Sequence, residues 1–217
     1  MKYTTWIAIG SILAACASQP QPAPTSAAIT ETSPATALPE ATAAPSAADY
    51  PAPEQTHMAV VDEYFERGYA VWLRDWGQIW IFVEPIVEPG KIEIGGALIG
   101  PETESQVLTT GGPWYRFADT FDPATDAQTD PALTPPPGMQ QPKGGIGKIW
   151  RANKELQAAM GWALDWERPH KTFINSYAIG VLGKGEGFVQ TGRLYTIYAS
   201  DGALFYVHEE AGIWSRP

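Results

Sequence analysis

The chain has 217 residues, which is enough for one domain with a sizeable core beside a shorter N-terminal region. Residues 58–217 hold 20 acidic and 13 basic side chains, a net charge of −7 without a Lys/Arg-rich run, which argues against nucleic acid as a partner. Cys16 is the only cysteine, so disulfides, cysteine metal sites and cysteine nucleophiles are excluded from the rest of the chain.

The N-terminus has the pattern of an export signal. Met1-Lys2 gives a positive start, and the apolar run 6–15 is far shorter than the ~20 residues of a spanning helix. The run closes with Leu13-Ala14-Ala15-Cys16, which resembles the lipobox of bacterial lipoproteins. This resemblance implies that residues 1–15 are removed and that a diacylglyceryl thioether on Cys16 anchors the protein to the outer face of a membrane. The alternative is an ordinary secretory signal.

Residues 16–57 have the composition of a tether. After Cys16 they are almost entirely Ala, Pro, Ser, Thr, Gln and Glu, with eight prolines and no glycine. Such a segment has too little apolar surface to offset its ordering entropy, so we expect it to be disordered and extended. At about 3.1 Å per residue, it would reach roughly 120 Å from the membrane. A single exported domain is predicted over residues 58–217.

Two segments of this domain predict β-hairpins. The first spans 69–84 with a turn at 75–77, and the second spans 193–208 with a turn at 200–202. Each is followed by a Gly-x-Trp-x-Arg motif, at Gly112–Arg116 and Gly212–Arg216. We interpret this recurrence as a degenerate internal duplication.

Residues 148–160 predict the one main helix. Ile149, Ala152 and Leu156 fall on one stripe, and Gly161 stands where a glycine commonly ends a helix. Between the first hairpin and this helix, 119–145 predicts a long loop rich in Pro, Asp and Gly. The expected fold class is therefore α+β, mostly β, built from small antiparallel hairpins with one main helix.

Several segments between residues 65 and 166 resemble a repeat unit of uncharacterised bacterial exported proteins. The segments that carry the resemblance are Phe65–Gly68, Ile79–Val83, Trp114–Phe121, Pro135–Gly138, Gly147–Arg151 and Gly161-Trp162. This family brings no known activity. The helix, the Gly-Trp pair and the following hairpin also resemble LGFP-repeat modules, which are associated with attachment to the cell envelope. Where those repeats read Leu-Gly-Phe/Trp-Pro, this chain has Met160-Gly161-Trp162-Ala163, a departure that weakens the implied role in wall binding.

No catalytic motif stands out in the sequence. Residues 58–217 contain two histidines, His170 and His208, and no Gly-x-Ser-x-Gly elbow or zinc-type histidine spacing. The glycine-rich segment Gly183–Gly187 matches no phosphate-binding pattern, so a turn before a strand is favoured. A run of four aspartates, at positions 119, 122, 126 and 130, suggests either calcium or a solvated loop, and the flanking prolines favour the loop. We therefore expect no metal and no cofactor.

The aromatic residues give the strongest functional signal. In the segment 78–84, one face carries Trp80 and Phe82 and the other is aliphatic. Either this strand is buried on both sides, or its aromatic face meets a ligand. Trp76 stands in the turn itself, where burial is hardest, and Trp72 precedes it. These four residues are the candidate ligand-binding set, with core packing as the competing interpretation.

The sequence thus favours a membrane-anchored, extracytoplasmic lipoprotein whose domain is a non-enzymatic binding module. Its expected partners are the membrane, through Cys16, and a cell-envelope glycan or protein. Two alternatives stay open. One is an exported carbohydrate hydrolase, which would need two carboxyl groups about 5–10 Å apart in a cleft. The other is a structural subunit of an envelope complex, which would show an extended apolar patch of several hundred Å².

Overall fold

A computed structural model describes residues 50–85, 91–94, 106–183 and 187–217. The chain divides into two units, Met1–Thr42 and Ala43–Pro217, and the described residues all belong to the second. The expected signal peptide, the lipidated Cys16 and most of the expected tether lie outside the described residues. Within the described part, no helix is long and apolar enough to cross a membrane.

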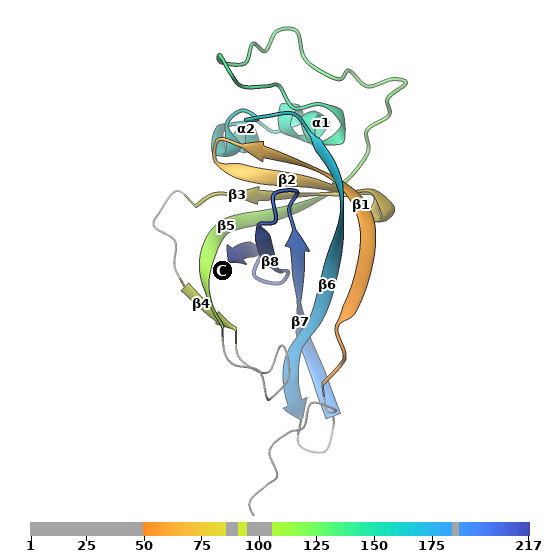
Figure 1. Cartoon of the computed structure of the whole chain (residues 1–217), viewed down its shortest axis with the longest axis vertical. Coiled ribbons are helices and arrows are strands. Elements are labelled where there is room, and N and C mark those ends of the chain that lie inside the picture. The colour runs from red at the N-terminus through yellow and green to blue at the C-terminus, as the bar shows by residue number, and fades with distance from the viewer. Residues whose placement is uncertain (1–49, 86–90, 95–105, 184–186) are drawn as a thin grey trace, which may run out of the picture. The chain divides into compact units, whose positions relative to one another are not determined.

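The described residues form nine antiparallel strands in one sheet (Figure 1). The strands are β1 (Glu54–Phe65), β2 (Gly68–Leu73), β3 (Gln78–Val83), β4 (Lys91–Ile94), β5 (Gln106–Ala118), β6 (Arg168–Gly183), β7 (Gly187–Tyr198), β8 (Leu204–His208) and β9 (Ile213–Arg216). Their order is β3-β2-β1-β6-β7-β8-β9-β5-β4, and β3 also pairs with β5. This extra pairing closes eight strands into a barrel and leaves β4 outside the ring. The α+β, mostly β fold class is confirmed.

The barrel consists of two four-stranded meanders, β1-β2-β3-β5 and β6-β7-β8-β9, joined where β1 pairs with β6 and β5 with β9. Both predicted hairpins are confirmed. The first is β2–β3, whose turn is the short 3-10 helix η2 (Arg74–Trp76), followed by Gly77 at a φ of 58°. The second is β7–β8, with the turn before β8 closed by a bond from the Ala199 N–H to the Ala203 carbonyl.

The barrel interior is filled by large apolar side chains from every second position of the strands. Trp80 and Trp214 are at most 1% exposed, and Phe82 is wholly buried against Trp214 and Phe205. The other members of this interior core are Met58, Val60, Tyr69, Val71, Leu73, Trp114, Ile174, Tyr195, Ile197, Ala199 and Val207. Aromatic side chains therefore fill much of the barrel interior.

Helices cover the outer face of the first meander (Figure 1). Ile79, Ile81 and Val83 of β3 point outward and pack with Ile146, Trp150 and Met160 of the helical segment. Strand β3 is thus buried on both faces, one inside the barrel and one beneath the helices. This double burial explains why both faces of the segment 78–84 are apolar.

The prediction of one helix over 148–160 is wrong in its extent. Two helices occur, α1 (Gly144–Ala152) and α2 (Lys154–Met160), separated by Asn153 with φ −118° and ψ 101°. The Asn153 side chain donates to the Ile149 carbonyl at 2.7 Å, while its own carbonyl accepts the Gln157 N–H. Asparagine competes with helical hydrogen bonding in this way, and so it separates two helices that share one apolar stripe.

Regular structure extends beyond the predicted segments at two places. Strand β1 begins at Glu54, and residues 54–57 pair with β6, so regular structure begins before the expected boundary at Met58. Strands β6 and β7 form a long hairpin; β7 follows the glycine-rich segment as predicted, residues 184–186 lie outside the described residues, and β6 was not predicted. Gly180 and Gly192 lie within this hairpin, and a bulge follows Ile179, so its pattern carries little regular alternation.

Candidate functional site

A cavity of about 320 Å³ opens at one end of the barrel interior, and we call it the aromatic pocket. It is lined by Glu54, Thr56, Trp76, Gln78, Trp80, Arg116, Ile174, Ser176, Arg193 and Tyr195. Most of these residues continue the inward-facing rows of the strands. Ser176, for example, stands two positions beyond the core residue Ile174, and Arg116 two beyond Trp114. The pocket is therefore the place where the apolar filling of the barrel gives way to polar side chains.

Three aromatic rings form the floor of the aromatic pocket. Trp76 lies 5.7 Å from Trp80 and 6.2 Å from Tyr195, and the Trp80 and Tyr195 rings are 5.2 Å apart, all between centroids. Trp80 is wholly buried and Tyr195 is 8% exposed, whereas Trp76 is half-buried. The turn residues 74–77 hold Trp76 against the end of the core. Its ring is the aromatic surface that a ligand can reach.

Polar groups surround this floor. Arg116 forms an ion pair with Glu209 at 2.7 Å. The Arg193 guanidinium donates to the Ser176 hydroxyl at 3.1 Å. Burial, with a further contribution from the Glu209 carboxylate, raises the pKa of Tyr195. The Tyr195 hydroxyl donates to the Glu209 carboxylate at 3.4 Å, so a ligand meets this phenol as an acceptor. The pocket thus combines ring faces with guanidinium, hydroxyl and carboxylate groups.

The four aromatic residues predicted to bind a ligand do not form one surface. Trp76 and Trp80 meet in the aromatic pocket. Phe82 is wholly buried, with its ring 5.4 Å from Tyr69 and 5.1 Å from Phe205. Trp72 lies on the outer face of the sheet and lines a different pocket. Phe82 thus has a packing role, and the two pockets separate Trp72 from Trp76.

Of the residues that line the aromatic pocket, only Trp76 and Trp80 were predicted; the most important of those missed are Arg116, Arg193 and Tyr195. The sequence contains a weak signal for two of them, because Arg193 and Tyr195 alternate with Leu194 at the start of the second predicted hairpin. Arg116 belongs to the first Gly-x-Trp-x-Arg motif, which was read only as part of a repeat.

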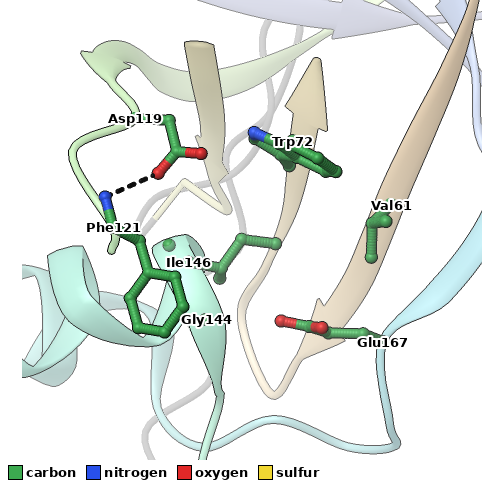
Figure 2. A pocket seen from close by; sticks show the side chains of 8 residues that line it. Val61, Trp72, Asp119, Phe121, Gly144, Ile146 and Glu167 are labelled. Carbon is green, nitrogen blue, oxygen red and sulfur yellow. Dashed lines mark hydrogen bonds between the residues drawn. The ribbon is translucent and has the colours of Figure 1, made fainter. Parts of the chain in front are cut away.

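A second cavity, of about 170 Å³, lies between the outer face of the sheet and the start of α1 (Figure 2). We call it the helix-side pocket. It is lined by Val61, Trp72, Asp119, Phe121, Gly144, Gly145, Ile146 and Glu167. Figure 2 shows Asp119 and Glu167 on different sides of this pocket, with Ile146 between them. Asp119 accepts a hydrogen bond from the Phe121 N–H at 3.1 Å, so one of its oxygens is already engaged.

A buried carboxyl group, Glu63, is coupled to the acid of the helix-side pocket. Glu63 is 1% exposed. Its pKa is raised to about 9, chiefly by burial and further by the nearby Glu167 carboxylate, while Lys143 opposes the shift. Burial also raises the pKa of Glu167 itself. Glu63 is therefore protonated at neutral pH in the folded protein.

The aspartate run forms turns rather than a metal site. Asp122 and Asp130 each accept the backbone N–H two residues onward at 2.9 Å, and Asp126 accepts the Asp122 N–H and pairs with Lys148 at 2.7 Å. This side-chain-to-backbone bonding is typical of Asx turns. Across the described ranges, no group of three or more His, Cys, Asp or Glu side chains could hold a metal ion.

A serine–histidine contact occurs between β8 and β9, but it is inaccessible. His208 Nε2 lies 2.7 Å from the Ser215 hydroxyl, and burial lowers the pKa of His208. Ser215 is wholly buried, so its hydroxyl cannot reach a substrate. The pair links β8 to β9 and has a structural role.

Comparison of the chain with family models, with curated proteins and with solved structures finds no significant match.

Proposed function

We propose that this protein is a lipid-anchored extracytoplasmic binding module that holds a cell-envelope glycan in the aromatic pocket. The observation that carries the proposal is the half-buried Trp76 ring, which stands over Trp80 and Tyr195 at the open end of the barrel. A rigid ring at a concave opening, with few apolar groups to cover it, leaves apolar surface for a partner.

A glycan suits this pocket better than a protein does. The cavity of about 320 Å³ is near the small end of ligand pockets, and it is concave rather than flat. Protein interfaces usually bury about 800 Å² on each partner, with an apolar centre. Here a single accessible indole is surrounded by side chains that exchange hydrogen bonds with hydroxyl groups, including Gln78, Ser176 and Arg193. Sugar rings present the matching chemistry, an apolar face and a rim of hydroxyls.

One observation favours a second function, an exported carbohydrate hydrolase. Glu167 and Asp119 both line the helix-side pocket, and burial raises the pKa of Glu167 as a general acid requires. Glu63 cannot join them at a substrate because it is buried beneath the surface. We rank this function second, because one oxygen of Asp119 already accepts the Phe121 N–H and the cavity of about 170 Å³ is smaller than the aromatic pocket, at about 320 Å³.

We also propose that the two meanders descend from a duplicated unit, with the N-terminal copy having gained the helices between β5 and β6. Three features support this interpretation. Each meander has the same succession of antiparallel strands, each contains a hairpin that turns at a glycine, and each ends in the Gly-x-Trp-x-Arg motif. Trp114 and Trp214 of those motifs both point into the barrel core.

The anchor is tested by Cys16→Ala. The substitution removes the thiol that the lipobox pattern assigns to the diacylglyceryl group, so the protein should move from the detergent phase to the aqueous phase on phase separation. Wild-type protein expressed in the same bacterial host is the control. Aqueous partitioning of both proteins would show that the lipoprotein interpretation is wrong.

The binding site is tested by Trp76→Ala. Because Trp76 stands at the edge of the core, its removal should cost about 1–2 kcal/mol of stability while retention on isolated cell envelopes falls about tenfold or more. Trp166→Ala is the matched control, since Trp166 is 50% exposed and lies outside both pockets. Pull-down and thermal melts of the three proteins separate binding from folding. Equal retention of all three would exclude Trp76 from the binding site.

A further inference from the structure

We infer that the ligand of the aromatic pocket is a sugar acid, a saccharide with a carboxylate on its ring, and that the Arg193 guanidinium binds this carboxylate. This inference rests on the proposed glycan-binding function and adds the chemical class of the glycan. The evidence for a sugar acid is the set of charged side chains around the pocket, whereas the aromatic floor supports glycan binding in general.

Two arginines line the aromatic pocket although the domain is acidic. Residues 58–217 contain seven arginines against 20 acidic residues, yet two of the seven, Arg116 and Arg193, line this one cavity. Glu54 also lines it, at the exposed start of β1. An acidic surface repels anionic glycans in general, so a paired guanidinium site is where such a ligand could be accepted.

The two arginines differ in how firmly their charge is paired. Arg116 Nη1 lies 2.7 Å from Glu209, whose side chain is 23% exposed, so this pair is close and partly shielded. For Arg193, the one carboxylate within 4.0 Å of the guanidinium in the described part of the chain is that of Glu54, at 3.7 Å. Glu54 is 79% exposed, and 3.7 Å is too long for a hydrogen bond.

Arg193 is therefore the group whose charge is available to a ligand. An exposed ion pair contributes little to stability, so a ligand carboxylate can replace Glu54 with little loss. The replacement would form shorter, charge-assisted hydrogen bonds, for which the planar guanidinium is well suited. Ser176, which accepts from the Arg193 guanidinium at 3.1 Å, holds this side chain at the pocket wall. A saccharide stacked on Trp76 would then present its carboxylate to Arg193 and its hydroxyls to the remaining polar groups.

The inference is tested by titration calorimetry with trigalacturonic acid and its methyl ester, two probes with the same sugar rings, of which the ester has methylated and therefore uncharged carboxyl groups. At low salt, the wild-type protein should bind the acid about tenfold more tightly than the ester. Arg193→Gln should abolish this preference. Glu54→Gln should strengthen binding of the acid several-fold, because the competing carboxylate is gone, and leave the ester unchanged. Arg168→Gln is the matched control, since Arg168 pairs with Asp165 outside the aromatic pocket.

Failure of the sugar-acid inference can be distinguished from failure of the proposed glycan binding. Equal, Trp76-dependent binding of acid and ester would overturn the sugar-acid inference and leave the glycan function standing. The inference is equally overturned if neither probe binds while Trp76-dependent retention on cell envelopes persists. If envelope retention is also independent of Trp76, the proposed function fails as well. Saturable binding of inorganic phosphate with the affinity of the acid would show that charge alone is recognised, which again contradicts a sugar-acid site.

Discussion

Replacing Glu63 with glutamine should make the protein more stable at pH 8 and change the pH dependence of its unfolding. In the folded protein the pKa of Glu63 is raised from 4.5 to about 9. Between these two values the folded protein keeps a proton on Glu63 that the unfolded chain releases. The stability associated with the neutral form is fully present below the unfolded pKa and is lost as pH rises towards the folded pKa. The loss is about 1.4 kcal/mol per pH unit within this window.

The neutral glutamine side chain avoids this loss. Between pH 5 and pH 8, the wild-type protein should lose about 3–4 kcal/mol relative to Glu63→Gln. Urea unfolding of both proteins at the two pH values measures the difference, and Glu155→Gln, a change at an exposed residue of α2, is the control. Parallel stability curves for wild type and Glu63→Gln would show that Glu63 ionises as readily in the folded protein as in the unfolded chain.

Replacing Gly111 with alanine should strongly destabilise the barrel. A Cβ atom at this position would overlap the Trp214 indole ring. Trp214 cannot easily yield, because it is 1% exposed, packs 5.4 Å from Phe205 and donates from Nε1 to the Val83 carbonyl at 2.9 Å. Gly111 also lies where the register between β5 and β9 shifts, at the seam between the meanders. We expect a loss of about 3 kcal/mol, or roughly 10 °C in melting temperature.

Gly202→Ala provides the comparison for Gly111→Ala. Gly202 has a φ of 88° but open space around its Cα, so alanine there meets only the backbone penalty of about 1–2 kcal/mol. The Gly111 variant should therefore melt clearly below the Gly202 variant in calorimetry. If Gly111→Ala melts within a degree or two of wild type, the seam is less tightly packed than the interior contacts of Trp214 indicate.

The hairpins were predictable because their signals are local. An Asp-x-Gly turn in one segment and an Asp-Gly turn in the other each stand beside a strand rich in aromatic residues, and β2–β3 and β7–β8 follow from them directly. The closure of the barrel was not predictable in this way. Closure depends on the pairing of β1 with β6 and of β5 with β9. The paired segments are about 100 residues apart, so no local turn signal in the sequence predicts these contacts.

The residues of the aromatic pocket also divide into those with a local sequence signal and those placed by long-range pairing. Trp76 could be singled out because a tryptophan in a tight turn is hard to bury locally. Arg193 and Tyr195 reach Trp76 only after the two meanders close, so their role depends on long-range pairing. Phe82 shows the opposite case: its apolar strand suggested a ligand-facing surface, but the covering helices bury the second face and leave Phe82 inside the core.

The central claim, that a glycan binds over Trp76, is tested most directly by NMR of the tryptophan indole N–H groups during titration with solubilised cell-envelope glycan. The indoles of residues 58–217 report on different places, with Trp76 and Trp80 at the aromatic pocket, Trp72 at the helix-side pocket and Trp166 on the exposed surface. Binding should shift the Trp76 and Trp80 resonances in a saturable manner and leave Trp166 unchanged. Shifts confined to Trp72, or no saturable shift at Trp76, would contradict the proposed site.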